Sequence, residues 1–298
     1  MEAVHHLPHP DTLLVIACGG ERYESKVQFS NFIDGDSHCL IEDTEHIKDA
    51  QVMIKHYLYP NQNEQIIRLL LIVGTIKNLG AASVEVFVPY LPYSRQDKAH
   101  FPGEAVAAEL LCRWLNQAGV QMLYTLDCHF MKGASATEVE GLAITNLLVQ
   151  DFLIKQLEMA LDGEQYQVIG PDAGASYLAQ GETMKKARAH NYRQNTDGSI
   201  SRNIATLEDA HLQINHDTMV VADDMVSTGS TMIKALENLR ARDVKNLYAM
   251  TTHGLFLKGS YEIINGITEG LFYSDSIPLN GAVPVVDTIF ETILSKHP

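Results

Sequence analysis

Short apolar runs rich in β-branched residues alternate with longer stretches of helical periodicity along most of the chain. Strands are predicted over 13–17, 52–55, 84–88, 122–126, 166–169, 219–222 and 246–250. Helices are predicted over 64–79, 104–117, 144–161 and 231–240. This alternation is typical of βαβ units, so the sequence predicts an α/β fold built on mostly parallel, doubly wound sheets. A length of 298 residues suggests two domains.

Polar residues follow several predicted strands at the point where each strand ends. In open α/β sheets, ligands bind beyond the carboxyl ends of the strands. The candidate functional segments are therefore 90–97, 127–129, 171–174, 223–231 and 253–254.

The segment TMVVADDMVSTGSTMIKAL carries the strongest local signal. Two acids, Asp223 and Asp224, end an apolar run and suit a ribose diol or a bridging cation. Five small residues then open a helical pattern: Ser227, Thr228, Gly229, Ser230 and Thr231. Free N–H groups at such a helix start form a phosphate cradle. The alternative is a turn in which Ser227 or Thr228 only caps the helix.

The charge of the chain limits its partners. With 22 Lys and Arg against 37 Asp and Glu, the net charge is −15. This disfavours binding to nucleic acid or to an anionic membrane surface. Phosphate groups would instead meet backbone amides, metal ions and a few placed bases. The scattered cysteines, Cys18, Cys39, Cys112 and Cys128, predict reduced thiols, and with no visible signal peptide we expect a cytoplasmic protein.

One long segment, 181–217, has weak periodicity and many polar residues. Its basic residues are Lys185, Lys186, Arg188, Arg193 and Arg202. A segment of this kind is either a functional lid or a solvated β-hairpin, with its turn at 196–199.

The motif VVADDMVSTGST resembles the phosphoribosyl-diphosphate motif shared by phosphoribosyltransferases and ribose-phosphate pyrophosphokinases. Further segments resemble the pyrophosphokinase family and occur in its order: FIDGD, PYLPYSRQD, LDCH, PDAG, THGLF and SIP. The resemblance implies two phosphoribosyltransferase-like domains. Residues 1–140 would bind ATP and 141–298 the ribose phosphate, with the last residues packing on the first domain.

The resemblance also implies a reaction and its residues. A pyrophosphoryl group would pass from ATP to the anomeric hydroxyl of ribose 5-phosphate, giving 5-phosphoribosyl 1-diphosphate and AMP. The residues that match the ATP-binding positions are Phe32, Asp34, Asp36, Arg95, Gln96, Asp97 and His129. His129 and Asp172 match the Mg²⁺ positions, and Asp223 to Thr231 match the ribose-phosphate loop. Lys186 and Arg188 match the catalytic cations, with Lys185 and Arg193 as alternatives.

In the family, the loop matched by 32–36 reaches a neighbouring subunit, so we expect a homo-oligomer based on dimers, with a hexamer as the larger assembly. Three departures leave alternatives open. The region between Ala17 and Phe32 is short for the family's first helix, GASYLAQ follows Asp172, and the loop reads STGST. The alternatives are transfer to another ribosyl phosphate such as ADP-ribose, as in NAD metabolism, a non-catalytic regulatory homologue and, last, a phosphoribosyltransferase.

Overall fold

The computed structural model describes residues 8–171, 185–187, 192–194, 200–202, 206–208 and 213–296. Contacts divide the chain into two units. One unit comprises Gln150–Ser274, and the other joins the segment that ends at Val149 with the segment that begins at Asp275. The predicted boundary after residue 140 falls between two paired strands, and the division lies after Val149 instead.

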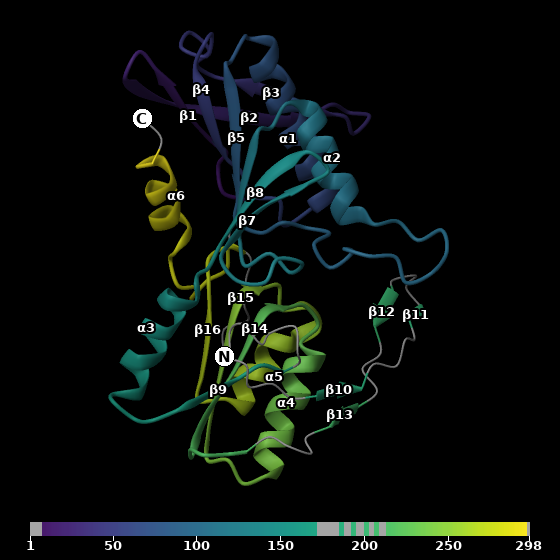
Figure 1. Cartoon of the computed structure of the whole chain (residues 1–298), viewed down its shortest axis with the longest axis vertical. Helices are drawn as coiled ribbons and strands as arrows, with labels where there is room; N and C mark the ends of the chain where they lie inside the picture. Colours follow the sequence, from purple (N-terminus) through teal and green to yellow (C-terminus); the bar gives the residue numbers. More distant parts are fainter. Residues whose placement is uncertain are drawn as a thin grey trace. The chain divides into compact units, whose positions relative to one another are not determined.

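The discontinuous unit contains an eight-stranded sheet in the order β3-β2-β1-β4-β5-β6-β8-β7 (Figure 1). The strands are β1 (Leu13–Cys18), β2 (Glu21–Asn31), β3 (Ser37–Ile41), β4 (Gln51–Lys55), β5 (Ser83–Val88), β6 (Met122–Leu126), β7 (Ser135–Val139) and β8 (Leu142–Leu147). The central strands β4, β5, β6 and β8 run parallel, whereas β1, β2, β3 and β7 join their neighbours antiparallel. The carboxyl ends of β4, β5 and β6 therefore lie at one edge.

The main core of this unit lies between the sheet and helices α1 (Gln62–Asn78) and α2 (Ala107–Ala118). It contains Val84 and Val86 of β5 together with Leu69 of α1 and Leu111 of α2, all buried. Phe87 lies between Val86 and Val88 and so points to the opposite face of the sheet. There it stacks on Phe290 of helix α6 (Val286–Leu294), with ring centroids 5.8 Å apart. Helix α6 thus covers part of the second face.

The continuous unit contains a wholly parallel sheet in the order β16-β15-β14-β9. Its strands are β9 (Gln167–Ile169), β14 (Thr218–Val226), β15 (Asn246–Gly254) and β16 (Gly270–Tyr273). Its helices are α3 (Gln150–Leu161), α4 (Ser230–Ala241), the short η2 (Leu257–Gly259) and α5 (Ser260–Ile267). Helices α4 and α5 lie side by side (Figure 1).

The long polar segment contains two short antiparallel pairs. Strand β10 (Lys185–Ala187) pairs with β13 (Thr206–Glu208), and β11 (Tyr192–Gln194) pairs with β12 (Ile200–Arg202). The pairing of β11 with β12 agrees with the predicted hairpin, while its turn at 196–199 lies outside the described residues.

The two sheets confirm the predicted α/β class, and three local predictions need correction. The helix predicted over 144–161 is strand β8 followed by α3, because residues 142–147 alternate in burial and pair with both β6 and β7. The segment between Ala17 and Phe32, for which no element was predicted and which is short for the family's first helix, contains strand β2, which pairs antiparallel with β1. Strand β14 continues past Asp223 and Asp224 to Val226, because it keeps pairing with β15.

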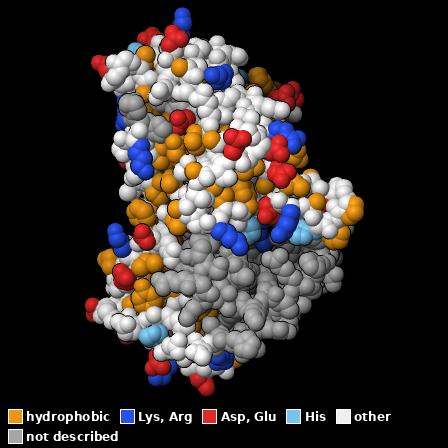
Figure 2. Space-filling model, viewed as in Figure 1, with side chains coloured by type: hydrophobic (Ala, Val, Ile, Leu, Met, Phe, Trp, Pro, Cys, Tyr) orange, Lys and Arg blue, Asp and Glu red, His pale blue; other side chains and the backbone are white. Residues whose placement is uncertain are grey.

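Across the described residues, none of the helices has both the length and the apolar character needed to cross a bilayer. On the face drawn in Figure 2, acidic and basic side chains are scattered among one another. This face therefore offers no broad field of positive charge for a polyanion.

Candidate active site

The two acids of the strongest motif lie within the last part of β14. Asp223 pairs in register with Thr251 of β15 and is half-buried, while Asp224 is buried. Because they are consecutive in a strand, their side chains point to opposite faces of the sheet. The backbone N–H of Asp224 also donates to Oδ1 of Asp223, at 3.0 Å. This bond holds the Asp223 carboxylate at the carboxyl end of the strand.

The small-residue loop begins directly after β14 and leads into α4. Thr228 and Ser230 are exposed, Ser227 and Thr231 are half-buried, and Gly229 is buried. Gly229 has the left-handed conformation (φ 72°, ψ −3°), which lets the chain turn sharply into the helix. Its carbonyl accepts from the N–H of Ile233 at 2.8 Å, so the helix starts here.

Gly229, rather than Ser227 or Thr228, is therefore the N-cap of α4, and no side-chain hydrogen bond caps the helix from that position. This weakens the simpler interpretation of the loop as a serine or threonine cap. The first-turn N–H groups of α4 lie beside two exposed hydroxyl side chains. Such a helix start can bind a phosphate group.

The neighbouring strand β15 places further polar side chains at the same edge of the sheet. Thr252 and His253 are buried at its carboxyl end, and His253 pairs in register with Met225 of β14. The hydroxyl of Ser274, just after β16, donates to the carbonyl of Thr252 at 2.7 Å. The candidate phosphate loop is thus flanked by a rigid, hydrogen-bonded edge.

In the other unit, the segment 89–97 follows β5. Tyr90, Leu91 and Ser94 are buried, whereas Arg95 and Gln96 are exposed and Asp97 is half-buried. The turn is held from both sides: Gln96 N–H donates to the Tyr93 carbonyl at 2.8 Å, and its own carbonyl accepts from Ala108 of α2 at 3.2 Å. The buried aromatic part of the segment anchors it. The three polar residues predicted to bind ATP extend from that anchor.

His129 follows β6, the next strand of the same sheet, and lies half-buried. The loop that contains it is held by Asn146, whose Oδ1 accepts from Cys128 N–H at 2.8 Å and whose Nδ2 donates to the Gly133 carbonyl at 2.9 Å. Buried Asp127 also accepts from Val149 N–H at 3.2 Å. Because β5 and β6 are adjacent and parallel, this sheet edge carries both His129 and the 95–97 segment.

The residues 32–36 form the tip of the hairpin between β2 and β3. The Phe32 N–H donates to the Asp36 carbonyl at 2.8 Å, and Gly35 takes up φ 100°. Phe32 is 58 % exposed and Asp34 and Asp36 are exposed as well. At the base of the hairpin, Asn31 bonds Arg68 of α1 at 3.1 Å. This loop therefore lies at the tip of a hairpin whose base is hydrogen-bonded to α1. In the sequence it is distant from the other residues predicted to bind ATP.

Two predicted residues, Asp172 and Arg188, lie outside the described residues, as do all but the first of the positions 171–174. Lys186 lies in β10, opposite Leu207 of β13. The structure thus brings the acid pair together with the small-residue loop in one unit, and Arg95, Gln96, Asp97 and His129 at one sheet edge in the other.

No group of three or more His, Cys, Asp or Glu side chains gathers into a metal-binding cluster in the described part of the chain. Mg²⁺ usually keeps several waters and takes one or two carboxylates together with substrate phosphates. In one unit, His129 at a strand end is a donor that such an ion can take beside its waters. In the other unit, the carboxylates of Asp223 and Asp224 are donors that it can also take.

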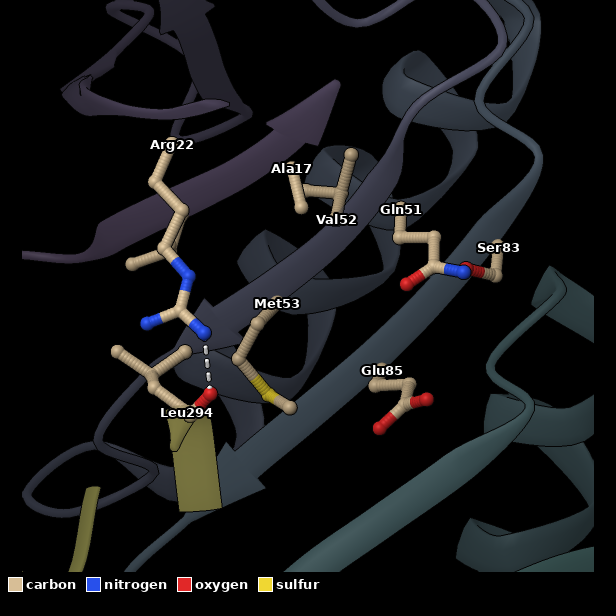
Figure 3. Close-up of a pocket in the computed structure, with 9 residues that line it drawn as sticks. Ala17, Arg22, Gln51, Val52, Met53, Ser83, Glu85 and Leu294 are labelled. Carbon is tan, nitrogen blue, oxygen red and sulfur yellow. Dashed lines mark hydrogen bonds between the residues drawn. The ribbon is translucent and has the colours of Figure 1, made fainter. Parts of the chain in front are cut away.

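A separate pocket lies at the opposite edge of the eight-stranded sheet (Figure 3). It is lined by Arg22, Met53, Ser83 and Glu85 among others, and Ser83 is the first residue of β5. The Arg22 guanidinium donates to the carbonyl of Leu294 at the end of α6, at 2.6 Å. This pocket lies at the amino ends of the parallel strands and is not part of the candidate active site.

Sequence reasoning missed the residues that support the site. Asn146 fell inside a predicted helix, and its role depends on β8 running beside β6. Ser260, which packs against Gly229, lies 31 positions along the chain from it and has no motif of its own. Neither could be found without the pairing of the strands.

Comparison with known protein families matches both halves of the chain. The model for the N-terminal domain of ribose phosphate pyrophosphokinase matches residues 16–119, and the model for the phosphoribosyl transferase domain matches residues 143–263. Together these cover the hairpin tip, the 95–97 segment and the small-residue loop.

Comparison with individual proteins gives the same result. The chain is 28 % identical over 247 residues to the ribose-phosphate pyrophosphokinase of Methanopyrus kandleri, covering 81 % of this chain and 83 % of that protein. It is 27 % identical over 264 residues to the enzyme of the same name from Sulfurisphaera tokodaii, covering 88 % of each. The crystal structure of phosphoribosylpyrophosphate synthetase from Mycobacterium smegmatis matches with a TM-score of 0.66 at 18 % identity, covering 85 % of this chain and 81 % of that one.

Proposed function

The chain belongs to the ribose-phosphate pyrophosphokinase family, and from this premise we propose that it transfers the pyrophosphoryl group of ATP to ribose 5-phosphate. The anomeric oxygen forms a bond to the β-phosphorus, the bond from that phosphorus to the α–β bridging oxygen breaks, and the hydroxyl proton is released. The products are 5-phosphoribosyl 1-diphosphate and AMP. The observation that carries the proposal is the direct succession of acid pair, small-residue loop and helix start from β14 to α4.

The acceptor half of the site follows from that succession. The N–H groups of the loop 227–231 and the hydroxyls of Thr228 and Ser230 bind the 5-phosphate without adding positive charge. Asp223, half-buried at the carboxyl end of β14, accepts hydrogen bonds from the ribose hydroxyls, whereas the buried Asp224 side chain points to the opposite face of the sheet. With the phosphate at one end and the diol at the other, the sugar is oriented so that its anomeric hydroxyl can be presented for in-line attack.

The donor half uses the edge that carries Arg95, Gln96, Asp97 and His129. The Arg95 guanidinium is exposed and suits phosphate oxygens of ATP through its planar fork of donors. His129 lies in a hydrogen-bonded loop, so it contributes a fixed contact near the same phosphates.

We assign neutralisation of the phosphate charges to Mg²⁺ and to basic residues of the segment 181–217, which would act as a lid. Lys186 and Arg188 bring cations to the transferring group, where negative charge must be stabilised. His129 and Asp172 would hold the magnesium ion, directly or through water. When bound, that ion neutralises phosphate oxygens and helps to align the reacting groups.

We further propose that the hairpin tip works in a second copy of the chain. Phe32 is 58 % exposed and Ile33 is fully exposed, so this tip presents apolar surface that an adenine ring or a partner could cover. The expected assembly is a dimer or a multiple of dimers. Sedimentation of the wild-type chain as a monomer at micromolar concentration would contradict this arrangement.

The reaction is tested by incubating the chain with ATP, Mg²⁺ and ribose 5-phosphate and following the products by phosphorus NMR. We expect AMP and 5-phosphoribosyl 1-diphosphate in equal amounts. Asp223→Asn should raise the KM for ribose 5-phosphate, because its carboxylate contact to the sugar is lost. The matched control is Asp243→Asn, which changes an exposed acid in the connection between α4 and β15.

ADP-ribose in place of ribose 5-phosphate forms the second arm of the same assay. Turnover with ADP-ribose alone would reject ribose 5-phosphate as the acceptor. Absence of AMP with either acceptor would reject catalysis and favour a regulatory homologue. Loss of AMP formation in both Asp172→Ala and Lys186→Ala would link the reaction to the assigned metal ligand and lid cation.

A further inference from the structure

The connection between β15 and α5 turns through three residues of left-handed conformation. Phe256 has φ 46°, Lys258 has φ 59° and Gly259 has φ 72°. A non-glycine residue held in this region is strained and persists only where surrounding contacts impose it. Two such residues so close together indicate that the turn is held in place by its neighbours.

Those neighbours are Val226, the last residue of β14, and Ser227, the first residue of the candidate phosphate loop. The N–H groups of Leu255 and Phe256 donate to the carbonyl of Val226, at 2.9 and 3.1 Å. The N–H of Leu257 donates to the carbonyl of Ser227 at 2.8 Å. The turn therefore fixes the two carbonyl groups from which the loop departs.

Phe256 anchors the turn from the other side. Its ring is buried and packs edge-on against Tyr261 and Tyr273, with centroids 5.4 and 5.1 Å away. The ring also lies over Gly254, where an added Cβ would come within 2.3 Å of a ring carbon. The turn is thus held in place by the packing of Phe256 on Tyr261 and Tyr273 and by its hydrogen bonds at the end of β14.

Ser260, the first residue of α5, contacts the centre of the phosphate loop. It is 1 % exposed, and its Cβ would lie only 2.6 Å from a Cβ added to Gly229. Its hydroxyl donates to the Ser227 carbonyl at 3.4 Å. The backbone at Gly229, where the loop turns into α4, therefore packs against the Ser260 side chain.

We propose that Ser260 is a positioning residue for the phosphate loop. Its β-carbon packs against Gly229 and its hydroxyl donates to the Ser227 carbonyl. The start of α5 therefore sets the direction in which the loop N–H groups point. Ser260 acts through the loop and does not touch the substrate. This inference rests on the proposed function, because the loop is taken to bind the 5-phosphate of the acceptor.

The first test enlarges the side chain that packs against Gly229. Ser260→Val adds bulk at the contact with Gly229, and we expect it to raise the KM for ribose 5-phosphate about tenfold, because small displacements of a binding loop are costly. The KM for ATP should not change. Ser260→Ala retains the β-carbon but loses the hydroxyl contact with the Ser227 carbonyl, so it should raise the KM for ribose 5-phosphate less than Ser260→Val does. An equal rise in both KM values, or no rise for ribose 5-phosphate, would overturn the proposal.

The second test is a double-mutant cycle that does not depend on a bulky residue. Gly229→Ala should raise the KM for ribose 5-phosphate, partly through its left-handed φ and partly through the clash with Ser260. Adding Ser260→Gly removes the clash, so the double variant should bind the acceptor better than Gly229→Ala alone. Additive effects, with no coupling between the two positions, would show that Ser260 does not seat the loop.

The matched control is Gly266→Ala, which adds a methyl group in α5 where no atom lies within 4 Å. It should leave both KM values unchanged. A wild-type chain that fails to turn over ribose 5-phosphate would refute the proposed function. An active wild type whose Ser260→Val variant retains the wild-type KM for the acceptor would refute only the positioning role.

Discussion

At the scale of single residues, a buried polar side chain is informative when both of its hydrogen-bonding partners are defined. His56 follows β4 and is fully buried. Its Nε2–H donates to the Gln65 carbonyl at 3.2 Å, so its Nδ1 accepts from the Thr12 hydroxyl at 2.7 Å. This arrangement requires the neutral ring, and burial lowers the pKa of His56 to about 3. A protonated ring would have to reverse the Thr12 bond, with Nδ1–H donating to the hydroxyl, and would carry a buried charge.

His56 should therefore make the chain sensitive to acid. The unfolded chain takes up a proton near the ordinary histidine pKa of about 6.5, whereas the folded chain does not until about pH 3. The stabilisation is complete above pH 6.5 and falls by roughly 1.4 kcal/mol per pH unit below it. Urea unfolding between pH 7 and pH 4 should show a shallower pH dependence in His56→Gln.

The control for that experiment is His100→Gln, which replaces an exposed histidine and should retain the wild-type slope. A His56→Gln variant with the same slope as the wild type would contradict the assignment of the pH dependence to His56.

Asn146 gives a second prediction at this scale. Its side chain accepts from Cys128 and donates to Gly133, holding the loop that contains His129. Asn146→Ala leaves a buried N–H without its partner and should lower the free energy of unfolding by roughly 1–3 kcal/mol. Asn146→Asp retains the acceptor for Cys128 but loses the donor to Gly133. If the Cys128 bond contributes more than the Gly133 bond, urea denaturation should show Asn146→Asp to be at least as stable as Asn146→Ala.

At the scale of secondary-structure elements, helix α6 is the clearest case of an element placed by tertiary contacts. Phe290 stacks on Phe87, Lys55 pairs with Asp287 at 2.7 Å, and Arg22 donates to the carbonyl of Leu294. The partners on the sheet lie in β5, β4 and β2, more than 200 positions earlier in the chain. Helix periodicity alone indicates that α6 is amphipathic but not which sheet it covers.

Truncating the aromatic contact should show how much α6 contributes. Phe290→Ala removes a buried ring and should lower the free energy of unfolding by about 3–5 kcal/mol, whereas Phe290→Leu should lose less because it fills part of the space. Thr292→Ala, at an exposed position of the same helix, is the control. Equal urea midpoints for Phe290→Ala and Thr292→Ala would show that the stacked pair adds no stability.

At the scale of the whole molecule, a chain of net charge −15 is proposed to bind two phosphate-bearing substrates. The phosphate loop offers backbone N–H groups and hydroxyls, and few basic side chains are assigned to the site. The remaining neutralisation must then come from a divalent cation. This reasoning concerns charge balance and does not depend on which carboxylates hold the ion.

The proposed reaction should therefore require a divalent cation. Excess EDTA should abolish AMP formation from ATP and ribose 5-phosphate, and added Mg²⁺ should restore it. A circular dichroism spectrum in EDTA serves as the control for loss of fold. Full activity in EDTA, with the fold intact, would contradict this dependence.

Local patterns in the sequence were sufficient for the α/β class, for strands such as β5 and β6, and for the helix start at the phosphate loop. Apolar periodicity and small polar residues after a strand depend on neighbours only a few positions away, so they can be read directly. Tertiary structure decided that residues 142–147 are a strand and that 21–31 pair antiparallel with β1. It also decided that Ser260 meets Gly229. These outcomes depend on hydrogen bonds and packing between distant segments, and no local pattern encodes which segments meet.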